Sequence, residues 1–171
     1  MLDRREVIEY YNARVQEIKY SGRREDRVED REVFQLKHIR VEEGMRRDIE
    51  SINTAMSLEK LGDFLSQQKF SSFPVVDALG QLNGILSLSD YQAALKRGDT
   101  SLLTAIDIAT HNVVTVTQHD TLFSALTRIT APDFAILPVV DRNNPKKLLG
   151  VISRRDIMSA LIDAIVQKRS V

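Results

Sequence analysis

The run FSSFPVVD at Phe70–Asp77 returns 64 residues later as FAILPVVD at Phe134–Asp141, and this repetition decides the fold. The same shift aligns residues 47–77 with residues 111–141 without a gap. An internal duplication fixes an architecture more firmly than local propensities do, because each copy must form the same supersecondary unit. The chain is therefore predicted to fold as two copies of one unit.

A second repeated run follows each of these segments. Residues 84–90 read GILSLSD and residues 150–156 read GVISRRD, so both copies carry the pattern Gly-x-x-Ser-x-x-Asp. The shift between these two runs is 66 residues, because two residues are inserted in the turn at Asn143–Pro145. Together the two copies fill residues 41–165.

The hydrophobic periodicity within each copy predicts the order β-α-β-β-α. The first helix of each copy is expected to begin after an N-cap hydroxyl, which Ser57 and Thr121 supply. A second helix follows each Gly-x-x-Ser-x-x-Asp run. The predicted strands are 49–52, the run ending at Asp77 and 82–86 in the first copy, and 113–116, the run ending at Asp141 and 148–152 in the second.

A three-stranded sheet with two helices on one side leaves its other face apolar. Neither copy, of about 60 residues, is therefore expected to be stable alone, whereas packing sheet on sheet would bury both apolar faces. The predicted fold class is α/β (α+β), with two β-α-β-β-α repeats packed sheet to sheet with pseudo-two-fold symmetry and preceded by an N-terminal helix.

The N-terminal region is highly charged and has its own pattern. Apolar residues recur there at helical spacing, at Ile8, Tyr11, Val15 and Ile18. They predict an amphipathic helix over residues 3–20. Residues 23–32 are nearly all charged and are interpreted as a solvated connector, with the folded body beginning near Val33. The predicted division is 1–40 for helix and connector, 41–98 for the first repeat and 99–171 for the second.

Composition excludes several classes of function. The 171 residues hold 24 Lys+Arg against 24 Asp+Glu, so there is no basic field to attract nucleic acid. The absence of cysteine excludes disulfides and thiolate chemistry and suits a reducing compartment. No apolar run approaches the length of a membrane span, and no secretory signal is visible. We therefore expect a cytoplasmic chain that neither enters a membrane nor binds nucleic acid.

The sequence contains no recognisable enzyme motif. It lacks a Gly-x-Ser-x-Gly elbow, a phosphate-binding Gly-rich loop ending in Lys-Ser/Thr, and a His-Glu-x-x-His helix. Its three histidines, His38, His111 and His119, have no metal-ligand spacing, and ordinary surface or edge positions are favoured for them. No catalytic residue and no metal site are predicted.

The repeated Gly-x-x-Ser-x-x-Asp pattern allows two interpretations. A serine at an N-cap with an acid three residues later is a common helix start, and a single copy would indicate only that. A hydroxyl at a helix N-terminus is also an anion site, however, and a carboxylate one turn in can accept hydrogen bonds from a ribose. Arg154 and Arg155 add two cations in the second copy only. Duplication favours the nucleotide interpretation.

With these motifs the chain resembles a tandem CBS-domain pair, also called a Bateman module, over about 125 residues. Among such pairs it is most similar to the cytosolic tail of CLC-type chloride channels and transporters. That finer similarity is carried by three segments: KFSSFPVV at 69–76, AIDIAT at 105–110 and KLLGVISRRD at 147–156. CBS pairs also occur in other transporters, in metabolic enzymes and alone.

The resemblance implies two pseudo-symmetric adenine-nucleotide sites, each with a base pocket from one repeat and a ribose acid from the other. In the first, backbone near Ile49 and Ser71 would hold the adenine against Phe70, Pro74 would shape the pocket, and Asp156 would meet the ribose. The first site comprises Ile49, Phe70, Ser71, Pro74, Ser153, Arg154, Arg155 and Asp156. The second comprises Val113, Phe134, Ala135, Pro138, Ser87 and Asp90. Phe70 and Phe134 could equally be core residues at a strand start.

The function implied is regulatory and not enzymatic. An adenine nucleotide (ATP, ADP or AMP) would bind between the repeats as a regulatory ligand, without any cofactor, and its occupancy would pass to an attached effector, a CLC-type channel or transporter. An alternative is a dimerisation module indifferent to nucleotide, because CBS pairs commonly form homodimers through their helices. A further alternative is the regulatory pair of another transporter or enzyme.

Overall fold

The computed structural model describes residues 31–98, 100–129 and 136–167. The helix predicted over residues 3–20 lies outside these ranges, as do Phe134 and Ala135 of the predicted second site. Within the described chain, no helix is both long enough and apolar enough to cross a bilayer.

The first half of the chain runs through two helices before its sheet begins. These are α2 (Arg31–His38) and α3 (Val41–Gly44), and then come β1 (Ile52–Asn53), α4 (Leu58–Ser66), β2 (Ser72–Val76), β3 (Leu82–Ser87) and α5 (Leu88–Lys96). The second half repeats this order from its own short helix, with α6 (Ala105–Ile108), β4 (Val116–Thr117), α7 (Leu122–Arg128), β5 (Ile136–Val140), β6 (Leu148–Ser153) and α8 (Arg154–Gln167). The predicted β-α-β-β-α order is confirmed in both copies.

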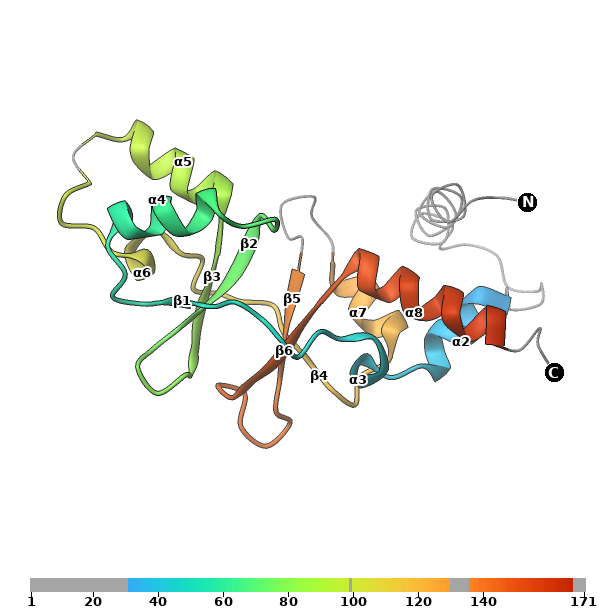
Figure 1. The fold of residues 1–171 in the computed structure, drawn as a ribbon. Coiled ribbons are helices and arrows are strands. Elements are labelled where there is room, and N and C mark those ends of the chain that lie inside the picture. Colours follow the sequence, from blue (N-terminus) through green and yellow to red (C-terminus); the bar gives the residue numbers. More distant parts are fainter. Residues whose placement is uncertain (1–30, 99, 130–135, 168–171) are drawn as a thin grey trace, which may run out of the picture.

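The two sheets have the same topology, in the orders β1-β2-β3 and β4-β5-β6. In each sheet the first pair of strands is parallel, the second pair is antiparallel, and the register shifts at the two valines of Pro-Val-Val-Asp. Figure 1 shows the sheets at the centre of the molecule, with α4 and α5 on one flank and α7 and α8 on the other. Ser57 and Thr121 cap α4 and α7 as predicted, each accepting a backbone N–H three residues on.

The first strand of each sheet is shorter than the sequence predicts. Strands were expected over 49–52 and 113–116, but β1 and β4 begin only at Ile52 and Val116. Ile52 pairs with Val75, so extending the parallel ladder backwards would require an N–H at Pro74, which proline lacks. Pro138 has the same effect on β4. Residues 49–51 are thereby left out of the ladder.

The sheets pack face to face, as predicted. Ile85 of β3 meets Ile136 of β5 and Val151 of β6, with Ile49 and Val113 against them. Two larger cores lie on the outer faces, one beneath α4 and one beneath α7 and α8. Removing these aliphatic side chains from water is the main source of stability for such a small sheet pair.

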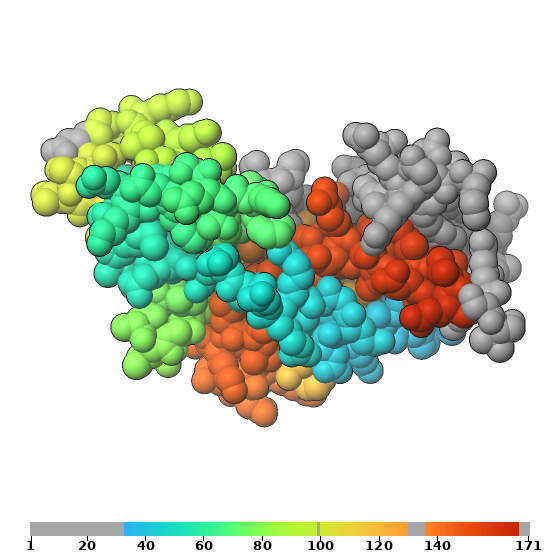
Figure 2. All heavy atoms as spheres, viewed as in Figure 1, coloured from blue at the N-terminus to red at the C-terminus, as the bar shows by residue number. Residues whose placement is uncertain are grey.

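The two repeats exchange short segments. Residues 41–46, which precede the strands of the first repeat, pack on the second, and residues 105–110, which precede the strands of the second repeat, pack on the first. Val41 and α3 pack into the core of the second half, and Ala105 of α6 packs into the core of the first. Arg46 exchanges two backbone hydrogen bonds with Val151, and Thr110 does the same with Ile85. Figure 2 shows the blue-to-cyan segment lying against the orange and red atoms of the second half. This exchange of segments was not predicted from the sequence.

The helix α2 is also absent from the sequence analysis, which places a connector up to residue 32. Its Leu36 is only 1% exposed and belongs to the core of the second half, packed with α7 and α8. A single turn of apolar residues gave too little periodicity to predict a helix. Burial against the second repeat, rather than local propensity, stabilises α2.

Close backbone approach explains the glycine of each Gly-x-x-Ser-x-x-Asp run. A Cβ on Gly150 would clash with the carbonyl oxygen of Arg46, and one on Gly84 would lie 3.1 Å from that of Thr110. These glycines let the exchanged segments cross the sheets. Packing alone thus requires a glycine at the first position of Gly-x-x-Ser-x-x-Asp, whether or not a ligand binds.

The turn after β2 makes stability depend on pH through Asp77. The N–H of Gln81 donates to its carboxylate and, with the N–H of Leu79, lowers the pKa of Asp77 below 3.8. A lowered pKa in the folded state stabilises the fold above the unfolded value, and this is lost as pH falls through the folded pKa. We expect Asp77→Asn to lower the melting temperature at about pH 7, and we expect this difference from the parent chain to shrink as the pH falls below the ordinary Asp pKa.

Melting curves by circular dichroism across that pH range test this expectation. Asp63→Asn serves as the control, because no hydrogen bond to its carboxylate is found among the described residues and its effect should not depend on this turn. An equal Asp77→Asn effect at both ends of the pH range would contradict the expectation.

Candidate functional site

A pocket opens between the two sheets, on the side where residues 46–50 cross them. Its walls come from this segment, from the start of β2 and from two residues of the second sheet. It is lined by Arg46, Asp48, Ile49, Glu50, Phe70, Ser72, Phe73, Pro74, Ile136 and Val151. The two repeats therefore form it jointly.

The apolar part of the pocket contains three of the predicted residues. Ile49 packs on the core between the sheets, Pro74 is buried in β2, and Phe70 lies just before β2 with 53% of its surface exposed. The exposure of Phe70 argues against the interpretation that it only fills the core. The structure thus brings together an aliphatic wall, a proline and an accessible aromatic ring.

Arg46 links this apolar part to the predicted ribose acid. Its guanidinium carbon lies 4.4 Å from the centroid of the Phe70 ring, and its Nε donates to Oδ2 of Asp156 at 3.2 Å. The Asp156 side chain is 16% exposed and the Arg46 side chain 29%. Although Asp156 does not line the pocket itself, one side chain connects it to the Phe70 ring.

Ser153 and Asp156 form a capping arrangement at the start of α8. Oδ2 of Asp156 accepts the N–H of Ser153 at 2.8 Å and its hydroxyl at 2.7 Å, and Oγ of Ser153 accepts the N–H of Asp156 at 3.2 Å. This is the helix-cap role. Among the described contacts, however, Oδ2 takes every bond to this carboxylate, so Oδ1 remains for a further donor.

Five predicted first-site residues do not line the pocket: Ser153 and Asp156 of the capping arrangement, and Ser71, Arg154 and Arg155. The carbonyl of Ser71 accepts the N–H of Leu88 at 2.8 Å and so holds the start of α5. Nη2 of Arg154 donates to the carbonyl of Ile129 at 2.9 Å, at the end of α7, where helix carbonyls lack partners within the helix. Arg155 is exposed on the first turn of α8.

Seven pocket residues were not predicted from the sequence. Three of them are apolar, Phe73, Ile136 and Val151, and four are polar: Arg46, Asp48, Glu50 and Ser72. The first three polar residues lie in the segment that was expected to be strand or connection. Ser72 is 5% exposed, and its buried Oγ has no hydrogen-bond partner in the described part of the chain. Two of the polar residues differ from their equivalents in the other repeat. Ser72 aligns with Ile136, and extending the alignment by one residue sets Arg46 opposite Thr110. These differences could have singled them out.

The predicted second site is described only in part. Ser87 and Asp90 repeat the capping arrangement on α5, with the Ser87 N–H and hydroxyl donating to Oδ2 at 2.8 and 2.7 Å. Val113 packs between the sheets and Pro138 is buried in β5. Phe134 and Ala135, its predicted base pocket, lie outside the described residues. No arginine takes the Arg46 position here.

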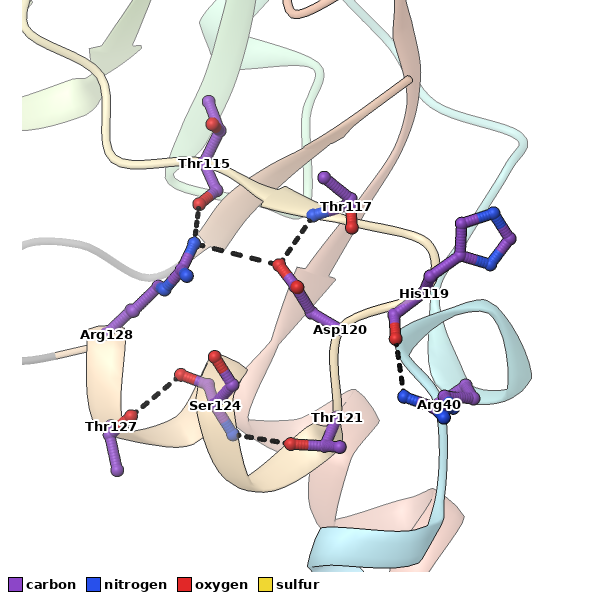
Figure 3. A network of polar contacts seen from close by, with 9 residues as sticks. All are labelled: Arg40, Thr115, Thr117, His119, Asp120, Thr121, Ser124, Thr127 and Arg128. Atoms are coloured by element: carbon purple, nitrogen blue, oxygen red, sulfur yellow. Dashed lines mark hydrogen bonds and ion pairs between the residues drawn. The ribbon is translucent and has the colours of Figure 1, made fainter. Parts of the chain in front are cut away.

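A polar network fixes the approach to α7, on the second repeat (Figure 3). Arg128 donates to the carbonyl of Thr115 at 2.7 Å and lies 3.7 Å from Asp120, which also accepts the N–H of Thr117 at 2.9 Å. Arg40 donates to the carbonyl of His119 at 2.8 Å and so ties the exchanged segment to this loop. These are structural contacts.

The histidines have local roles. Nδ1 of His38 lies 2.6 Å from the carbonyl of Phe34, and Nε2 of His111 lies 2.9 Å from that of Ile106. In the described ranges no three His, Asp or Glu side chains are grouped so that they could hold a metal ion.

Chemically, the pocket combines a ring face, aliphatic walls and charged groups at its mouth. Such a combination suits a planar heterocycle that carries a hydrogen-bonding substituent. The described lining contains two carboxylates, of Asp48 and Glu50, and one cation, Arg46, which is paired with the carboxylate of Asp156. Strongly anionic ligands are therefore less well matched than weakly charged ones.

The sequence matches the CBS domain family twice, over residues 36–97 and 105–163. Among solved structures, CBSX2 in complex with AMP is 22% identical, with a TM-score of 0.64 over 74% of this chain and 98% of that one. The CBS domain pair of protein MJ0100 in complex with 5′-methylthioadenosine and S-adenosyl-L-methionine is also 22% identical, with a TM-score of 0.60 over 70% of this chain and 97% of that one. These likenesses show the same fold.

A curated relative is the homoserine O-acetyltransferase of Methanohalobium evestigatum, which is 25% identical over 128 residues. That alignment covers 75% of this chain and 25% of the relative. The chain thus spans about a quarter of the length of the curated relatives it matches.

Proposed function

We propose, from the premise that this chain belongs to the CBS domain family as a tandem pair, that it is a regulatory module which binds an adenine nucleotide between its repeats. The module is not itself catalytic. A ligand that touches both repeats stabilises one arrangement of them, and it acts on an effector by its difference in affinity for the two arrangements.

One observation carries this proposal: a pocket built by both repeats that exposes the Phe70 ring and is joined through Arg46 to the Asp156 carboxylate. In the proposed complex the adenine packs against Phe70 between Ile49 and Pro74, and Oδ1 of Asp156 accepts a ribose hydroxyl. Ser153 remains the helix cap at the ribose end.

The ligand class is supported by the solved relatives. AMP, 5′-methylthioadenosine and S-adenosyl-L-methionine, named for two of them, share an adenosine and differ in charge. The carboxylates of Asp48 and Glu50 at the pocket, and the engagement of Arg154 with Ile129, favour AMP over ATP for this chain. AMP is therefore the proposed nucleotide, with ADP and ATP binding more weakly.

The proposal also concerns the effector that the module regulates, for which there are two candidates. The similarity of segments 69–76, 105–110 and 147–156 to CLC-type tails supports a channel or transporter on the cytosolic side of a membrane, joined through residues 1–40. The homoserine O-acetyltransferase relatives support a second candidate, the regulatory part of an enzyme. The full reading frame distinguishes the two.

A nucleotide-independent homodimer is the competing function. It is supported by exposed leucines on α5, where Leu88 and Leu95 are 41% and 49% exposed, and by Val166 of α8 at 56%. Dimerisation and ligand binding are compatible, so only the response to ligand separates the two functions.

Calorimetric titration of the purified chain with AMP, and separately with ATP, tests the proposal at fixed salt. We expect AMP to bind with a stoichiometry of about one and more tightly than ATP. If the chain sediments as a dimer and neither nucleotide gives heat on titration, the proposed nucleotide-binding function is wrong and the dimerisation function is favoured.

Phe70→Ala is expected to weaken AMP binding about tenfold, because stacking of a base on an aromatic ring is lost. Stability should change little, since the ring is half exposed. The control is Phe34→Ala, which removes an exposed ring from α2, away from the pocket lining. Equal AMP affinity in both variants, measured by calorimetry, would remove Phe70 from the site.

A further inference from the structure

Arg46 makes the two contacts that the proposed function assigns to a ligand. Its guanidinium covers the Phe70 ring at 4.4 Å, where an adenine would stack, and its Nε bonds Asp156, where a ribose hydroxyl would bind. A guanidinium is planar, stacks on aromatic rings and donates hydrogen bonds, as an aminopurine with its ribose does.

The fold does not explain the choice of arginine at this position. The structural task of residue 46 is done by its backbone, which exchanges hydrogen bonds of 2.9 and 3.0 Å with Val151. Thr110, its equivalent in the second half, makes the same backbone pair with Ile85 at 2.8 and 3.0 Å. The side chain of Arg46 is thus available for a role specific to this pocket.

A second polar group points to a ligand in the same place. Ser72 lines the pocket, is 95% buried and has an Oγ without a partner in the described ranges. Its equivalent in the second half is Ile136, whose side chain cannot form a hydrogen bond. The hydroxyl and the guanidinium are therefore both features of the first pocket alone.

Resting on the proposed function, we infer that Arg46 is a specificity-determining residue that selects phosphorylated adenosine ligands. Any adenosine ligand must displace its side chain from Phe70 and Asp156. The phosphate of AMP then offers the displaced cation a new partner, whereas adenosine offers none. Arg46 therefore lowers the affinity for adenosine. For AMP the same cost of displacement is offset by the new contact between the guanidinium and the phosphate.

The test compares adenosine and AMP on three chains by calorimetry at one salt concentration. For Arg46→Ala we expect adenosine to bind about fivefold more tightly than to the parent, and the ratio of AMP to adenosine affinity to fall about tenfold. Arg46→Lys keeps the charge without the planar group and should retain most of the AMP preference. Arg47→Ala, at the exposed neighbour outside the pocket lining, changes the same charge and should alter neither affinity.

The outcomes separate this inference from the proposed function. If the parent binds AMP and Arg46→Ala binds adenosine no more tightly, the inference is wrong and the nucleotide site stands. If Arg46→Ala binds both ligands and the parent binds neither, the pocket is a nucleotide site, but Arg46 blocks it for both ligands and its role in selecting AMP is wrong. If neither chain binds either ligand while both melt cooperatively, the nucleotide site fails and the role of Arg46 fails with it.

Discussion

Gly150→Ala is expected to lower the free energy of unfolding by about 3 kcal/mol. Any Cβ at this position clashes with the carbonyl oxygen of Arg46, and a backbone atom on a crossing segment cannot rotate away as a side-chain tip can. The clash would also disturb the paired hydrogen bonds between Arg46 and Val151. Urea denaturation followed by circular dichroism measures this loss.

The chain provides a matched control in Gly84→Ala. Gly84 occupies the same position of the motif in the first repeat, and a Cβ there would lie 3.1 Å from the carbonyl oxygen of Thr110 and 3.2 Å from the Cβ of Ala109. A shift of a few tenths of an ångström relieves these contacts, so the expected loss is about 1 kcal/mol. Equal losses in the two variants would contradict the difference in backbone approach.

The second large effect is expected for Asp156→Ala. AMP affinity should fall more than about tenfold, because the proposed hydrogen bond from the ribose to a carboxylate is lost. The same substitution removes the α8 cap, which costs about 1 kcal/mol of stability. Calorimetry and urea denaturation of the same preparation measure the two losses separately.

Asp90→Ala separates binding from capping. Asp90 caps α5 with the distances that Asp156 shows on α8, yet no arginine joins it to an aromatic ring among the described contacts. We expect the same loss of stability with AMP binding at the Phe70 pocket retained. If Asp90→Ala and Asp156→Ala weaken that binding alike, Asp156 acts only as a cap and the proposed ribose contact is wrong.

The duplicated runs predicted the fold well because the information they carry is local. The N-caps at Ser57 and Thr121, the two small sheets and the packing between them all follow from patterns within about 60 residues. The prediction was wrong where a residue distant in the sequence determines whether an element forms or where it begins. Strand β1 starts late because of Pro74 on its neighbour, and α2 exists because the second repeat buries Leu36.

Residues of the candidate site were predictable where they belong to the duplicated runs or lie beside them, and not where their position depends on the exchange of segments. The resemblance to CBS pairs, carried by the duplicated runs, named Ile49, Phe70 and Pro74, and all three line the pocket. Arg46 was missed because its role arises only from the exchange of segments, which brings it from before β1 to the end of β6. Arg154 was placed in the first site by its charge and by the resemblance to CBS pairs, but its side chain donates to the carbonyl of Ile129 at the end of α7.

The exchanged segment also gives ligand binding a short route out of the pocket. Arg46 has its side chain in the pocket and its backbone on β6, and a few residues earlier the same segment bonds the α7 loop through Arg40 and continues into α2. In the proposed complex the ligand displaces Arg46, so the change would begin in the segment that leads from α2 into the first repeat. An effector joined before α2 would be connected to the pocket through residues 31–46, with no rearrangement of either sheet required.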